Sequence, residues 1–121
     1  MKLNKITIAI AAGAVALSAT IAQADVKPAV VYDKAGKFDK SFNEAVWNGV
    51  KRFTADTGIS VREVEPTNEA QVEQGLKKLA KRGNSPIVAV GFSSANALSA
   101  AAQAYPDTKF TLIDMVVPEA N

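Results

Sequence analysis

The residues of this chain best suited to contact a ligand are two aromatic rings, one carboxamide and two carboxylates, all located after predicted strands. A phenyl ring stacks on a flat heterocycle, a contact that contributes about 1–3 kcal/mol per base in nucleic-acid complexes. A carboxamide donates and accepts at once, as the edge of a purine requires, and a carboxylate accepts from two neighbouring hydroxyls. Together they suit an uncharged, ring-bearing, hydroxylated small molecule. The residues are Asp33, Phe42, Asn43, Phe92 and Asp114.

Each of these residues also has a purely structural interpretation. Phe42 lies on the apolar stripe of a predicted helix and Phe92 follows an apolar strand, so core packing is the commoner role for both rings. Asp33 and Asn43 are of the types that form turns and helix caps, and Asp114 could cap a turn at the end of a strand. Taken one at a time, the five residues leave both interpretations open.

Several catalytic classes lack the residues they need. The 121 residues include no His and no Cys, which excludes His-dependent triads, cysteine nucleophiles, thiolate zinc sites and disulfides. The turn over residues 33–41 has one glycine where a dinucleotide fold needs G-x-G-x-x-G, and a P-loop is also missing. The carboxylates stand singly, so no metal site is predicted. We therefore expect a binding protein without a cofactor and not an enzyme.

The first 24 residues have the organisation of a secretory signal peptide. Met1–Lys5 is basic, Ile6–Ile21 is apolar, and Ala22-Gln23-Ala24 offers small residues for cleavage before Asp25. The apolar stretch is shorter than the roughly 20 residues that span a bilayer, so we expect cleavage and no stable membrane insertion. Since no Cys is available for a lipid, we expect the mature protein to be released into a bacterial periplasm.

Charge gives no reason to expect nucleic acid as a partner. The formal net charge of +2 can be assigned to Lys2 and Lys5, so residues 25–121 are balanced. One local cluster of cations remains, at the end of a predicted helix: Lys77, Lys78, Lys81 and Arg82. Cations at this position compensate the helix dipole, and we interpret the cluster in that way.

Hydrophobic periodicity alternates between strand and helix along residues 25–121. Short apolar or alternating runs predict strands near residues 28–33, 59–65, 86–91 and 109–114. Helical stripes occupy residues 42–53, 69–82 and 95–105. Ser41 and Glu44 form a capping-box pattern before the first helix, and Gly58 and Gly83 are suited to end the first two helices.

This alternation predicts an α/β fold with a parallel sheet and helices on both faces, joined by right-handed crossovers. The first strand is expected between the second and the third. In such sheets ligands bind beyond the carboxyl ends of the strands. That rule places all five candidate residues at the carboxyl ends of the strands, on one side of the sheet.

Three sequence blocks resemble the basic membrane protein family, the substrate-binding proteins of ABC importers that include purine-nucleoside receptors. The first block, Val30 to Asn43, holds a strand, an Asp, a Gly-bearing loop and the pattern Asp-x-Ser-Phe-Asn. The others are Val90-Gly91-Phe92 and residues 105–114. The resemblance covers residues 26–117 and departs from the family at Ala35, where a Gly is common.

The resemblance implies a type I periplasmic-binding-protein fold, in which two flavodoxin-like α/β lobes close on a nucleoside, and a permease with its ATPase as partners. It implies that Phe42 stacks on the base, Asp33 and Asn43 contact the base edge, and Asp114 holds the ribose hydroxyls. Family members are much longer, so we expect residues 25–121 to be the N-terminal part of a truncated first lobe that binds poorly alone. A sugar or autoinducer receptor of the same fold is one alternative; a nucleotide-dependent, flavodoxin-like enzyme domain is another.

Overall fold

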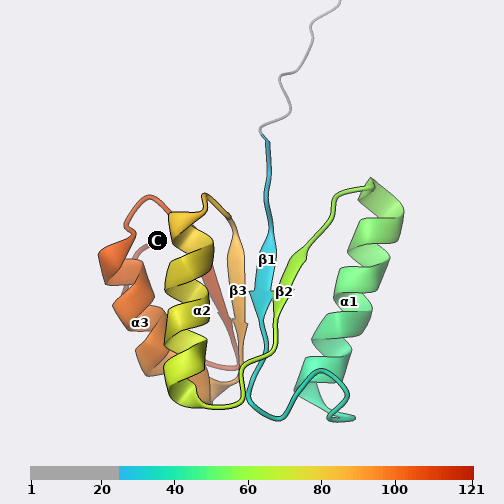
Figure 1. The fold of residues 1–121 in the computed structure, drawn as a ribbon, viewed down its shortest axis with the longest axis horizontal. Helices are drawn as coiled ribbons and strands as arrows, with labels where there is room; N and C mark the ends of the chain where they lie inside the picture. The colour runs from blue at the N-terminus through green and yellow to red at the C-terminus, as the bar shows by residue number, and fades with distance from the viewer. Residues whose placement is uncertain (1–24) are drawn as a thin grey trace, which may run out of the picture.

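The computed structural model describes residues 25–121, so the signal peptide expected over residues 1–24 lies outside the described residues. Strands and helices alternate from one end to the other, as the periodicity predicts (Figure 1). The elements are β1 (Ala29–Val31), α1 (Phe42–Thr57), β2 (Arg62–Val64), α2 (Glu69–Lys81), β3 (Ile87–Val90), the short 3-10 turn η1 (Phe92–Ser94), α3 (Ala95–Ala104) and β4 (Phe110–Ile113).

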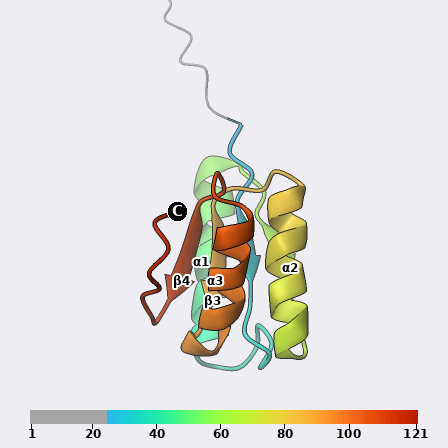
Figure 2. The ribbon, with the colours of Figure 1, turned by 90° about the vertical axis from the view of Figure 1, so that its left-hand side faces the viewer.

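The four strands form one parallel sheet in the order β2-β1-β3-β4. The expected strand order is therefore confirmed, although each strand is shorter than its predicted span. An isolated antiparallel bridge joins Lys27 to Ser85, ahead of the strands themselves. β2 and β4 form the two edges, of which Figure 2 shows β4, and the central β1 is hydrogen-bonded on both sides.

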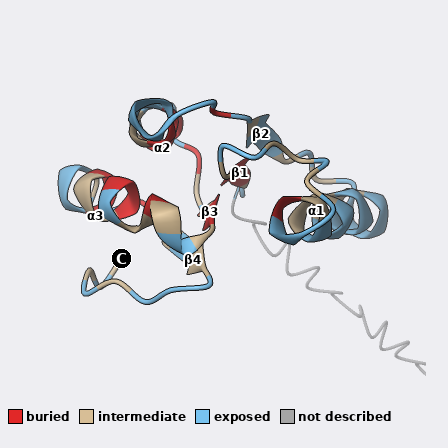
Figure 3. Ribbon diagram, turned by 90° about the horizontal axis from the view of Figure 1, so that it is seen from below, coloured by how far each residue is buried: buried red, intermediate tan, exposed pale blue. Residues whose placement is uncertain are grey.

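Helices cover both faces of the sheet, with α1 on one side and α2 and α3 on the other (Figure 3). Because side chains alternate along a strand, β1 contributes Val31 to the core beneath α2 and α3, and Val30 to the core beneath α1. Tyr32, the residue after β1, joins the α1 side and is fully buried. Within residues 25–121, no helix combines the length and apolarity needed to cross a membrane.

The start of α1 differs from the predicted capping box. Ser41 makes no side-chain capping bond, and Glu44 accepts from the backbone N–H of Lys40. The Asp39 carboxylate caps the helix in their place, because it accepts from the backbone N–H groups of Ser41, Asn43 and Glu44. The end of α1 follows the prediction, with Gly58 in the left-handed conformation at φ 73°.

α1 is only half-buried along its predicted stripe. Val46 and Val50 pack against the sheet, whereas Phe53 retains 38% exposure. An apolar groove of about 460 Å³ runs between this helix and the sheet within the described part of the chain. Phe42, the first residue of the stripe, lies where the strands have ended and therefore does not join the core.

Candidate functional site

A cleft of about 450 Å³ opens at the carboxyl ends of the strands. These ends point to the lower end of the molecule in Figure 1. All five residues singled out from the sequence line this cleft, so the fold brings together residues that are far apart in the chain. They come from the β1–α1 loop, the start of α1, η1 and the end of β4. The full lining is Asp33, Lys34, Asp39, Phe42, Asn43, Glu69, Val90, Gly91, Phe92, Ser93 and Asp114.

Two phenyl rings of the cleft face solvent. Phe42 is 54% exposed and Phe92 is 69% exposed, so the core-packing interpretation fails for both residues. Large apolar side chains that gather in a solvent-facing hollow are typical of contact sites. The cleft thus offers aromatic surface to a ligand from two separate elements, α1 and η1.

Asn43 has a different environment from its neighbour Phe42, since it is fully buried. Its Oδ1 accepts from the Asp33 backbone N–H at 2.9 Å, and its Nδ2 donates to the carbonyls of Asp33 at 3.2 Å and Gly36 at 3.0 Å. These bonds use both polar atoms of the amide. We therefore assign Asn43 to positioning the loop, in place of the direct base contact that the resemblance implies.

Asp33 is tied to the turn after β3. Ser93 donates its hydroxyl proton to one carboxylate oxygen, and the other oxygen accepts from the Ala35 backbone N–H at 3.3 Å. Gly91 makes room for this arrangement: its φ is +84°, and a Cβ there would lie 3.0 Å from Asp33 Oδ2. Ser93 was not among the sequence candidates, although it lies in the predicted turn at the same sheet edge.

Asp114 ends β4 with a left-handed backbone at φ 77°. Asp tolerates this conformation better than most residues because its short side chain can bond locally. The Gly91 N–H donates to the Ile113 carbonyl at 3.1 Å, which fixes the end of β4 against the turn that holds Asp33. The two carboxylates proposed from the sequence therefore follow β1 and β4, the strands on either side of β3.

The charge of the cleft is predominantly negative. Asp33, Asp39, Glu69 and Asp114 line it together with Lys34, which pairs with Glu69 at 3.4 Å. Such an excess of carboxylates repels phosphorylated ligands and favours neutral or cationic ones. Residues 25–121 contain no group of three acidic, His or Cys side chains placed to hold a metal ion.

The β1–α1 loop is anchored to the edge strand by charged groups. Lys37 Nζ lies 3.2 Å from Glu63 Oε2 and 3.5 Å from Glu65 Oε2. Tyr32 donates its hydroxyl proton to the same Glu63 oxygen at 2.6 Å. Burial first, and then Glu63, raise the pKa of Tyr32 well above its usual range, so the phenol remains a donor. This network holds the loop that carries Asp33 and Asp39.

The cap at Asp39 predicts a pH dependence of stability. Desolvation raises the pKa of Asp39, but its bonds from the backbone N–H groups of Ser41, Glu44 and Asn43 together lower it. A carboxylate with a lowered folded-state pKa stabilises the fold above its unfolded pKa, and the contribution is lost as the pH falls through the folded pKa. We expect Asp39→Asn to destabilise the chain at neutral pH and to lose this effect in acid.

Urea unfolding of wild type and Asp39→Asn between about pH 7 and pH 2 measures this difference. Ser41→Ala is the matched control, because the Ser41 side chain makes no capping bond and should change little at any pH. If the stabilities of wild type and Asp39→Asn run parallel over the whole pH range, the carboxylate does not cap the helix as described.

Comparisons with known proteins agree with this fold. The family model described as ABC transporter substrate-binding protein PnrA-like, named Bmp, matches residues 26–121. An uncharacterized lipoprotein of Pyrococcus furiosus is 36% identical over 90 residues, which are 74% of this chain and 23% of the relative. The nucleoside-binding protein BmpA of Lactococcus lactis subsp. cremoris is 26% identical over 99 residues, covering 78% of this chain and 28% of that protein.

Two solved structures share the fold of this chain. An ABC transporter solute-binding protein from Aeropyrum pernix superposes with a TM-score of 0.71 at 32% identity, over 78% of this chain and 26% of that one. A fragment of a putative lipoprotein from Peptoclostridium difficile also has a TM-score of 0.71, at 20% identity, which supports the fold alone; the match covers 79% of this chain and 80% of that one. The chain spans about a quarter of the length of the curated relatives.

Proposed function

Since this chain belongs to the Bmp family of PnrA-like ABC transporter substrate-binding proteins, we propose that its cleft binds nucleosides, with purine nucleosides favoured. The observation that carries the proposal is the pair of exposed rings, Phe42 and Phe92, in a cleft that also holds Asp33 and Asp114. Rings supply stacking for a base, and carboxylates supply acceptors for sugar hydroxyls. The relative named as a nucleoside-binding protein agrees with this assignment.

The two alternative ligand classes fit the lining less well. A free sugar would use the carboxylates but has no planar heterocycle to match the aromatic surface of the cleft. A nucleotide would bring its phosphates towards Asp33, Asp39 and Asp114. The family and its structural neighbours are solute-binding proteins, and we propose no catalytic activity.

We propose that the 121-residue chain binds its ligand weakly. Pockets for small molecules bury about 70–90% of the ligand surface. The cleft described here is one open wall, formed by strand ends and the loops beside them. We therefore expect nucleoside affinity in the millimolar range, and saturable binding at micromolar ligand would show that one wall suffices.

The test is a titration of the isotope-labelled chain with inosine, adenosine, ribose, galactose and adenosine monophosphate, followed by backbone amide resonances. We expect both nucleosides to shift Phe42, Phe92, Ser93 and Asp114, and the monophosphate and the free sugars to shift them far less. Shifts with ribose alone and none with nucleosides would overturn the nucleoside assignment. Shifts with the monophosphate equal to those with adenosine would show that the negative charge of the cleft does not select its ligand.

Asp114 provides a second test of the same assignment. If its carboxylate accepts from the ribose hydroxyls, Asp114→Asn replaces a charged acceptor by a neutral one, a difference of roughly 1 kcal/mol or about fivefold. We expect this loss for adenosine and little loss for 2′-deoxyadenosine. Asp107→Asn, an exposed exchange outside the cleft, is the control. Equal losses for both ligands would show that Asp114 does not contact the sugar.

We further propose that the protein acts outside the cytoplasm, in the periplasm, and delivers its ligand to a membrane permease driven by an ATPase. The family description and the predicted signal peptide support this placement. The Pyrococcus relative is described as a lipoprotein, whereas the 121 residues here contain no Cys to which a lipid could be attached. We accordingly propose a released protein.

A further inference from the structure

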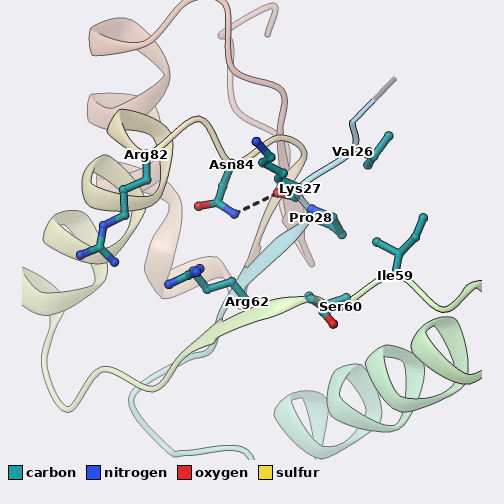
Figure 4. A pocket seen from close by; sticks show the side chains of 9 residues that line it. Val26, Lys27, Pro28, Ile59, Ser60, Arg62, Arg82 and Asn84 are labelled. Carbon is teal, nitrogen blue, oxygen red and sulfur yellow. Dashed lines mark hydrogen bonds between the residues drawn. The ribbon is translucent and has the colours of Figure 1, made fainter. Parts of the chain in front are cut away.

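A second hollow lies at the opposite end of the sheet from the nucleoside cleft. It has a volume of about 550 Å³ and opens beside the amino ends of the strands, where Pro28 precedes β1, Arg62 begins β2 and Asn84 precedes β3 (Figure 4). Nothing in the proposed nucleoside site uses these residues. The hollow is lined by Val26, Lys27, Pro28, Ile59, Ser60, Val61, Arg62, Arg82 and Asn84.

Two arginines from different elements reach into this opening. Figure 4 shows the side chain of Arg82, at the end of α2, and that of Arg62, on β2, extending towards the same gap. Both residues also line an adjoining hollow, whose other charged residues are Lys78, Glu63 and Glu65. Among the ion pairs of residues 25–121, none involves Arg62, Lys78 or Arg82.

Compensation of the helix dipole does not account for this cluster. The carboxyl end of a helix carries about half a negative charge, whereas Lys78, Lys81 and Arg82 bring three full positive charges to the end of α2. Arg62 adds a fourth from a strand, which has no such dipole to offset. The described residues therefore hold more positive charge here than their own structure requires.

Several positive charges that gather at one opening favour the binding of an anion. Two guanidinium groups in one opening repel each other, and salt largely screens such repulsion only between charges more than about 8 Å apart at physiological ionic strength. The two carboxylates that line the adjoining hollow, Glu63 and Glu65, are both already paired with Lys37. An anion from outside would place negative charge between the two arginines and remove the repulsion.

We propose that this hollow is a binding site for a phosphoryl group held between Arg62 and Arg82. A guanidinium presents a planar fork of donors that matches phosphate oxygens in pairs. A phosphoryl group has three terminal oxygens and up to two negative charges, so it can bridge two forks, whereas a single carboxylate has only two oxygens. The group could belong to free phosphate, a phosphate ester or a lipid headgroup.

Asn84 gives the hollow a fixed polar wall. It is 7% exposed, and its Nδ2 donates to the Lys27 carbonyl at 3.0 Å. This bond leaves the side-chain oxygen facing the opening in Figure 4. The oxygen can accept a hydrogen bond from a guanidinium or from a protonated phosphate oxygen, and it sits on a short segment anchored to both α2 and Lys27.

The experiment titrates inorganic phosphate into the labelled 121-residue chain at constant ionic strength, with chloride as the balancing anion. We expect saturable shifts of the Arg62 and Arg82 side-chain N–H resonances and of the Asn84 amide. Arg62→Gln and Arg82→Gln should each weaken binding about tenfold, the size expected for a lost charge-assisted bond. Arg52→Gln removes the same charge from the exposed surface of α1 and should leave the affinity unchanged.

A second arm identifies the source of the phosphoryl group. Vesicles of phosphatidylcholine with and without phosphatidylglycerol are sedimented with wild type and with Arg62→Gln. Phosphatidylglycerol-dependent binding that Arg62→Gln removes assigns a lipid headgroup; equal sedimentation of both proteins, together with phosphate shifts, assigns a free phosphate or ester. An absence of saturable shifts at Arg62 and Arg82, or equal weakening by Arg52→Gln and Arg62→Gln, overturns the proposal.

Discussion

Replacing Phe42 by Ala is expected to remove most of the nucleoside affinity of the cleft while leaving the fold intact. The ring is 54% exposed at the first residue of α1, so its loss takes little apolar surface from the core. Stacking of a base on an aromatic ring contributes about 1–3 kcal/mol, which corresponds to a loss of about 5-fold to 150-fold. Because the affinity of wild type is expected to be weak, such a loss makes binding barely detectable.

The initial slope of amide shift against nucleoside concentration measures this effect, and thermal unfolding measures the fold. Phe53→Ala is the matched control, since Phe53 lies on the same helix but faces the apolar groove. It should lower the melting temperature and leave nucleoside binding unchanged. If Phe42→Ala instead lowers the melting temperature and binds the nucleoside as wild type does, the ring is a packing residue and the proposed stacking is wrong.

Replacing the next residue, Asn43, by Ala is expected to have the opposite effect, a large loss of stability. The fully buried amide bonds the Asp33 N–H and the carbonyls of Asp33 and Gly36. Each backbone group left unsatisfied in a buried site costs about 1–3 kcal/mol, so the free energy of unfolding should fall by about 3 kcal/mol. The loop that carries Asp33 should then exchange its amide protons faster.

Urea unfolding with hydrogen exchange of residues 33–41 tests this expectation. Asn48→Ala provides the control, because Asn48 is an exposed residue of the same helix. An Asn43→Ala protein with wild-type stability and reduced nucleoside affinity would instead favour the direct ligand contact implied by the family resemblance. The two variants thus test two different roles at adjacent positions: ligand recognition by Phe42 and support of the loop by Asn43.

The features that follow general rules of α/β architecture could be predicted from the sequence. The strand order and the layer arrangement follow from alternating periodicity and right-handed crossovers. The location of the cleft follows from the rule that ligands bind beyond the carboxyl ends of parallel strands. This rule places Asp33, Phe92 and Asp114 together without any knowledge of side-chain contacts. Such rules concern the backbone path, which the periodicity of this chain indicates clearly.

Side-chain partners could not be predicted because they depend on how the loops run in space. Ser41 has the right type and spacing for a capping box, yet the acceptor of the free N–H groups is the Asp39 carboxylate. Asn43 bonds backbone atoms seven and ten residues away, which no local pattern encodes. Arg62 joins Arg82 only because β2 lies beside the end of α2, so the cationic hollow is a tertiary feature.

The packing around Trp47 gives the chain a built-in optical probe. Trp47 is the only tryptophan of the 121 residues. The ring of Phe38, from the β1–α1 loop, meets it edge-on at 4.9 Å, and Lys51 places its ammonium 3.7 Å from the centre of the indole. Lys51 lies on the same helix, whereas Phe38 belongs to the loop that carries Asp33 and Asp39. A shift in tryptophan emission without loss of helical circular dichroism would therefore report a rearrangement of that loop in unlabelled protein.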